Sequence, residues 1–130
     1  MTDTQVLVWS AILTFVMLTA ASLLRCQGWT PSGMQRAFGN RDDLPEPTAL
    51  AGRADRAANN MIEGLVIFTA LAAAVHFSGK GGAQSDLGAT LFFWARLIYW
   101  PVYLAGIAYL RTAIWFVSIA GLVMMVLAMW

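Results

Sequence analysis

The sequence has 130 residues, of which 59% are hydrophobic and only 12% are charged. With a mean hydropathy of +0.65, this composition excludes an ordinary water-soluble domain and predicts an integral membrane protein. The formal net charge of +1 is too small to indicate a nucleic acid or a strongly acidic partner, and the single Cys26 cannot form an intrachain disulfide.

Four apolar stretches are each long enough for a membrane-spanning helix, which needs about 20 mostly apolar residues. We expect these helices at residues 5–24, 54–77, 86–109 and 111–130. Residues 25–52 form the one long polar connection, where glycines and prolines predict a loop with at most a short helical turn. The sequence therefore predicts an all-α protein with one transmembrane domain over residues 1–130, folded as an up-down four-helix bundle.

Basic residues are concentrated at one end of the predicted bundle. Five of them flank or lie in the long loop, and a sixth follows the third helix on the same side: Arg25, Arg36, Arg41, Arg53, Arg56 and Arg111. The opposite side has only Lys80. By the positive-inside rule, the long loop is predicted to be cytoplasmic.

A polar stripe runs into the second predicted helix. Arg56, Asn60 and Glu63 are spaced at i, i+4 and i+7, so they share one face of a helix. A charged side chain that faces lipid costs several kcal/mol, so ionisable residues in a membrane segment face a bundle interior or a polar cavity. The stripe therefore marks a functional site by default.

The third predicted helix carries a matching stripe, formed by Arg96, Tyr99 and Tyr103. At a rise of 1.5 Å per residue, Glu63 lies roughly 14 Å and Arg96 roughly 20 Å from the cytoplasmic end. Because the two charges occupy similar depths, we expect Glu63 and Arg96 to be partners.

Together the two stripes resemble the MAPEG family, the membrane-associated proteins of eicosanoid and glutathione metabolism. The motifs that carry the resemblance are Arg56-x-x-x-Asn60-x-x-Glu63 and Arg96-x-x-Tyr99-x-x-x-Tyr103. The resemblance extends over nearly the whole chain, and it implies a homotrimer with glutathione held as co-substrate between neighbouring subunits near the cytoplasmic face. A bacterial-type member similar to microsomal glutathione transferase is implied, and with it a multi-pass protein of a bacterial inner membrane.

The resemblance also implies roles for individual residues. Six positions match the family's glutathione contacts: Arg56, Asn60, Glu63, Arg96, Tyr99 and Tyr103. Arg111 lies one residue from the place of the family's thiol-activating arginine and is the predicted catalytic residue. The eicosanoid enzymes of the family commonly have Tyr or Pro soon after the glutamate, whereas Gly64 follows it here.

The chemistry of glutathione suits these residue types. Arginine binds carboxylates in bidentate fashion, and Glu63 can accept hydrogen bonds from the ammonium group. A thiol with a pKa near 8.5 is mostly protonated at pH 7, so a neighbouring guanidinium raises the fraction of reactive thiolate. The sequence thus predicts a membrane-bound enzyme, transferase-like or peroxidase-like, that conjugates or reduces apolar electrophiles with glutathione.

Three other interpretations compete with this enzyme. In the first, the polar residues form a purely structural cluster that fixes the packing of the helices. In the second, the protein is a non-catalytic lipid-binding member of the same fold. A small four-helix multidrug transporter is disfavoured, because such exporters use an acidic residue within the first helix and residues 5–24 carry no charge. No group of Cys, His, Asp and Glu has the spacing of metal ligands, so we expect no metal site.

Overall fold

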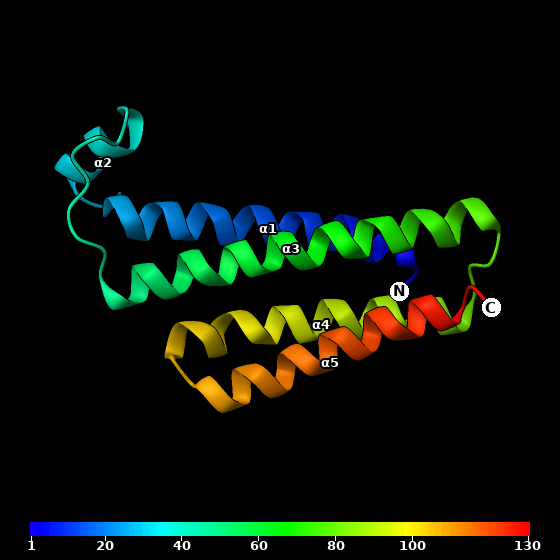
Figure 1. The fold of residues 1–130 in the computed structure, drawn as a ribbon. Coiled ribbons are helices and arrows are strands. Elements are labelled where there is room, and N and C mark those ends of the chain that lie inside the picture. Colours follow the sequence, from blue (N-terminus) through cyan, green and yellow to red (C-terminus); the bar gives the residue numbers. More distant parts are fainter.

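A computed structural model describes all 130 residues and contains five α-helices and no β-strand. The helices are α1 (Asp3–Cys26), α2 (Pro31–Phe38), α3 (Ala49–Ser78), α4 (Ala83–Ala105) and α5 (Ala108–Leu127). The four long helices lie side by side, and the short α2 lies at one end of α1 (Figure 1). Helix α1 packs mainly on α3 and α4 mainly on α5, while α4 also contacts α1 and α3. The predicted all-α class is confirmed.

Local capping explains where the helices differ from their expected bounds. Helix α3 begins at residue 49 because the Thr48 hydroxyl accepts a hydrogen bond from the Ala51 N–H at 3.1 Å. Helix α4 ends at residue 105, earlier than expected, because Gly106 adopts a left-handed conformation with φ of 78°. The expected loop contains α2, which starts at Pro31 and is capped by Thr30.

Three helices, α1, α3 and α5, are long and apolar enough to cross a membrane. Helix α4 has 23 residues, but it includes the charged Asp86 and Arg96, which lower its hydropathy. Composition alone therefore supports three spans rather than the expected four. The charge of Arg96 is directed into the protein, because the side chain is only 2% exposed.

The apolar core connects α3 to α4 through a pair of aromatic rings. The rings of Phe68 and Phe92 are stacked, with centroids 4.8 Å apart and an angle of 3° between their planes, and both side chains are fully buried. Met17 of α1 and Met61 of α3 are buried in the same core. This packing holds α3 and α4 together next to the polar residues that follow Phe92 in α4.

Helices α4 and α5 approach most closely at two glycines. A Cβ atom added to Gly121 would lie 2.5 Å from the carbonyl oxygen of Gly88 and 2.8 Å from the backbone nitrogen of Phe92. Small residues of this kind let helix backbones pack closely within a membrane. The register of α5 against α4, and with it the position of Arg111, depends on this contact.

Replacing Gly121 with alanine is expected to destabilise the fold by about 1–3 kcal/mol, because the new methyl group meets backbone atoms that cannot move away. Unfolding of the detergent-solubilised protein by titrated denaturing detergent, followed by circular dichroism, measures this loss. Gly82→Ala is the matched control, since no atom lies within 4 Å of a Cβ at that position. Equal stability of the two variants would contradict the close contact.

Candidate functional site

Arg96 is the central polar residue of the interior. Its Nη1 donates a hydrogen bond of 2.5 Å to Oδ1 of Asn60 on α3, whereas its Nε is buried without any hydrogen-bond partner. The guanidinium carbon lies 5.4 Å from the ring centroid of Phe92 and 5.5 Å from that of Tyr99. A buried guanidinium is thus held between α3 and α4 with donor capacity left for a ligand.

Gly64 of α3 leaves the space that the guanidinium of Arg96 occupies. A Cβ atom at Gly64 would lie 2.6 Å from Nη2 of Arg96 and 3.1 Å from its Cζ. The glycine that departs from the pattern of the eicosanoid enzymes therefore has a physical role here. Sequence reasoning did not assign it one, and its only sequence signal was a glycine directly after Glu63 inside an apolar helix.

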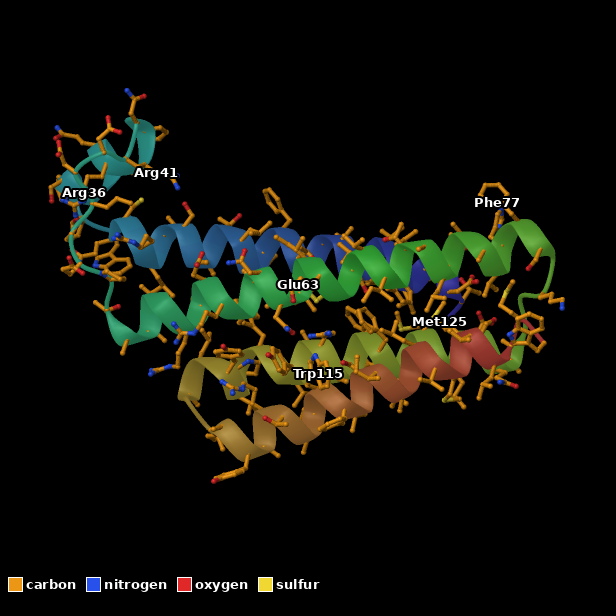
Figure 2. All side chains as sticks on the ribbon, viewed as in Figure 1. Arg36, Arg41, Glu63, Phe77, Trp115 and Met125 are labelled. Atoms are coloured by element: carbon orange, nitrogen blue, oxygen red, sulfur yellow. The ribbon has the colours of Figure 1, made fainter.

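Glu63 does not form the expected pair with Arg96 in the single chain. The hydrogen bond of the arginine goes to Asn60, which lies one turn earlier on α3, while the Glu63 side chain is exposed. Both charged residues nevertheless line one cavity of about 90 Å³ together with Asn60. Figure 2 places Glu63 near the middle of α3, at a similar level to Trp115 of α5, which lines the same cavity.

Asn60 also lines a second cavity, of about 200 Å³. Its walls come from α3, α4 and α5: Asn60, Tyr99, Tyr103, Arg111, Thr112 and Trp115. The guanidinium carbon of Arg111 lies 4.5 Å from the ring centroid of Tyr103, and the rings of Tyr99 and Tyr103 meet edge to face at 5.4 Å. Sequence reasoning missed Thr112 and Trp115, although they follow Arg111 at i+1 and i+4 on the same helix, α5.

A side chain of α3 holds the turn between α4 and α5, which precedes Arg111. The Nε of Arg53 donates a hydrogen bond of 2.9 Å to the carbonyl oxygen of Leu104, in the last turn of α4. This bond satisfies one of the carbonyl groups that a helix end leaves without a partner. The sequence placed Arg53 only among the basic residues at one end of the helices, and the structure shows that it positions the turn between α4 and α5.

Arg56 lies apart from the other predicted site residues. Its guanidinium is folded back over Gly52, where a Cβ atom would be 3.2 Å from Nη1. It lines a separate cavity of about 310 Å³ with Arg25, Pro47 and Asp55. Side chains of a helix point toward its N-terminus, so the reach of Arg56 is directed away from Asn60. Six of the seven predicted residues come together in one chain, and Arg56 does not.

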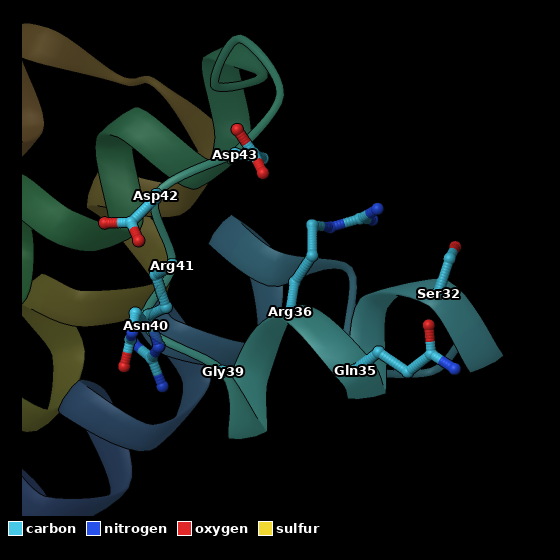
Figure 3. Close-up of a pocket in the computed structure, with 8 residues that line it drawn as sticks. All are labelled: Ser32, Gln35, Arg36, Gly39, Asn40, Arg41, Asp42 and Asp43. Atoms are coloured by element: carbon cyan, nitrogen blue, oxygen red, sulfur yellow. The ribbon is translucent and has the colours of Figure 1, made fainter.

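The two cavities at Asn60 are small, and both combine polar with apolar side chains. Each is below the roughly 300–1,000 Å³ of a typical small-molecule pocket. A larger cavity of about 440 Å³ lies around α2 and contains none of the predicted site residues (Figure 3). The arrangement at Asn60 can bind a polar ligand that has both an anionic and a cationic group, because Arg96, Arg111 and Glu63 lie around one amide side chain.

Replacing Gly64 with alanine is expected to push the Arg96 guanidinium away from Asn60 and to lower the free energy of unfolding by about 1–2 kcal/mol. In an Arg96→Ala background the same change should be neutral or stabilising, because the obstructing side chain is gone and alanine favours a helix over glycine. A double-mutant cycle, measured by unfolding in titrated denaturing detergent, distinguishes the two cases. The same cost in both backgrounds would show that Gly64 does not serve Arg96.

Comparison with known proteins gives one match, which covers nearly the whole length. The model of the MAPEG family matches residues 4–130. No curated protein and no solved structure matches the chain. The family is membrane-associated and includes glutathione transferases, in agreement with the three apolar helices and the buried polar site. The resemblance read from the two polar motifs is therefore confirmed, and the chain belongs to the MAPEG family.

Proposed function

We propose that this protein is a membrane-bound glutathione-dependent enzyme that conjugates or reduces apolar electrophiles. The observation that carries the proposal is the arrangement around Asn60, whose amide side chain lines two cavities that also contain charged residues. Arg96 and Glu63 line one cavity, and Tyr103 and Arg111 line the other. In a MAPEG chain, this set offers a partner to each charged and polar group of glutathione.

Binding would use the groups that the fold leaves available. The unpaired Nε of Arg96 is a donor for a carboxylate oxygen, and the exposed Glu63 is an acceptor for the ammonium group. Asn60 and the hydroxyls of Tyr99 and Tyr103 would form hydrogen bonds with the peptide groups of glutathione. Glutathione thus replaces the water that these groups would otherwise need.

The chemical step would take place beside Arg111. A guanidinium next to the sulfur stabilises the thiolate, so the thiol loses its proton at a lower pH. The thiolate then attacks the electrophilic carbon, the C–S bond forms, and the leaving group departs with the bonding electrons. The electrophile would reach the sulfur from the bilayer, because the outer surface of α5 is apolar and exposed at Phe116 and Val117.

We further propose a homotrimer of four-span protomers, with the active site shared between subunits and the loop between α1 and α3 in the cytoplasm of a bacterial cell. Glu63 and Arg56 support it, because both are exposed in a single chain, and Glu63 lies within an apolar span where contact with lipid is costly. A neighbouring subunit would cover these charges. It would also complete cavities that are too small to enclose a tripeptide.

A non-catalytic lipid-binding role is the alternative. It is favoured by an apolar cavity of about 210 Å³ between α1 and α3, lined by Leu7, Ala72, Ala73 and His76 among others, at a distance from Asn60 along the helices. A protein that binds only lipid has no need of a glutathione site. Glutathione binding therefore separates the two roles.

Glu63→Ala is expected to weaken glutathione binding by about 2–4 kcal/mol, because the ammonium group loses its only acidic partner in the site. Calorimetric titration of the purified, detergent-solubilised protein measures the change in affinity. The control is Glu46→Ala, which removes the same charge from the exposed loop. Unchanged affinity in a correctly folded Glu63→Ala variant would refute the binding site.

Arg111→Ala is expected to lower the rate of conjugation to a haloarene by about 10²–10³, since one electrostatic contact to the reacting sulfur is lost. The ultraviolet absorption of the bound thiolate should decrease in parallel, whereas glutathione affinity should change much less. Lys80→Ala, at the opposite end of the helices, is the control for loss of a cation. If the variant keeps both the thiolate band and the wild-type rate, Arg111 is not the activating residue.

Native mass spectrometry of the detergent-solubilised protein is expected to show three chains in one complex. Glu63→Ala should leave the complex intact while glutathione affinity falls, because one side chain is a small part of a subunit interface. A monomer that binds glutathione with full affinity would be incompatible with sites shared between subunits.

A further inference from the structure

Helix α2 is fixed to the end of α1. The Nη2 of Arg36 donates a hydrogen bond of 3.2 Å to the carbonyl oxygen of Cys26, the last residue of α1. A Cβ atom at Gly33 would lie 1.8 Å from the carbonyl oxygen of Gln27, so backbone touches backbone at this point. The Thr30 hydroxyl also bonds to Gln27 at 2.9 Å. These contacts make α2 a rigid extension of α1 rather than part of a free loop.

The position of α2 follows from this attachment. Helix α1 has the length and composition of a membrane span, so its C-terminal end, where Arg25 lies, reaches the membrane boundary. Figure 1 shows α2 at this end of α1, on the side away from α4 and α5. The helix therefore lies at the level of the lipid headgroups and beside the long helices.

Away from its contact with α1, helix α2 has an apolar face and a polar face. Met34 and Phe38 are spaced i and i+4 and are 55% and 87% exposed, and the preceding Trp29 is 68% exposed. The polar face lines the 440 Å³ cavity around α2 together with the following segment (Figure 3): Ser32, Gln35, Arg36, Gly39, Asn40, Arg41, Asp42 and Asp43. No apolar side chain lines that cavity.

We propose that α2 is an interfacial helix, with Trp29, Met34 and Phe38 inserted among the lipids and the polar cavity facing water. Amphipathic helices bind membranes in this way, with the apolar face about 5–10 Å below the headgroup boundary. Trp is enriched at the same level because one end of its ring is apolar and the other donates a hydrogen bond. The partner of this surface is the lipid boundary itself, which continues from the lipid around α1.

The charges next to α2 indicate whether its insertion depends on the charge of the lipid headgroups. Arg36 and Arg41 are balanced by Asp42 and Asp43, so the segment has no net charge to attract anionic headgroups. Insertion is therefore driven by apolar area and is expected to be the same with zwitterionic and anionic lipids. A basic amphipathic helix would behave differently, because its binding depends on anionic lipid.

Spin labels test this insertion in the full-length protein. Met34→Cys and Phe38→Cys carry a nitroxide label, with Ser32→Cys and Asn40→Cys as controls on the polar face. Each cysteine variant is made in two backgrounds, the wild type, where the native Cys26 is fully buried, and Cys26→Ala, where no second thiol can be labelled. The protein is reconstituted into phosphatidylcholine vesicles with and without phosphatidylglycerol. Collisions with oxygen report exposure to lipid, and collisions with a water-soluble nickel chelate report exposure to water.

Labels at positions 34 and 38 are expected to collide with oxygen and not with the chelate, at depths of about 5–10 Å in both kinds of vesicle. Labels at positions 32 and 40 should show the reverse. Chelate access at positions 34 and 38 overturns the proposal, and so does protection from both reagents, which places another copy of the chain on this surface. As a second measurement, quenching of fluorescence by lipids brominated near the carbonyl should be smaller in Trp29→Phe than in the wild type.

Discussion

The burial of one guanidinium determines how this protein is organised. Arg96 is only 2% exposed, and a charge buried in this way is costly unless neighbouring groups stabilise it. Asn60 supplies the hydrogen bond, the rings of Phe92 and Tyr99 supply faces for the cation, and Gly64 supplies the space. Helices α3 and α4 are thereby held in one relative position, which sets where the remaining polar residues of α4 lie.

The rest of the packing keeps this position rigid. The Phe68–Phe92 stack lies next to the site in the core, since Phe92 touches both Phe68 and the Arg96 guanidinium. Gly88 and Gly121 bring α5 close to α4, and Arg53 holds the last turn of α4. Tyr103 and Arg111 are consequently placed on two helices joined by a short, fixed turn. A site built on rigid helices keeps its donors in place when a ligand enters.

The exposed charges of α3 connect the site to the proposed assembly. Glu63 is directed to the outside of the single chain, and Arg56 lines a cavity of its own near Arg25. Both positions make physical sense in a trimer, where the surface of one protomer faces a neighbour instead of lipid. Helix α2 has no such need of a neighbour, because its exposed apolar residues match the membrane boundary at which α1 ends.

The amino-acid sequence by itself determined the all-α class, the apolar helices and the two polar stripes, because hydrophobic periodicity records which residues share a helix face. It also pointed to the family through those stripes. Tertiary structure decided which members of a stripe meet: Arg96 bonds to Asn60 rather than Glu63, and Arg56 turns back over Gly52. It alone gave roles to Gly64 and Arg53, and it ended α4 at the left-handed Gly106. The spacing of residues along a helix fixes the angle at which each side chain leaves the helix axis. The partner of a long side chain also depends on the direction of that side chain and on the distance to the neighbouring helix, and helix packing sets both.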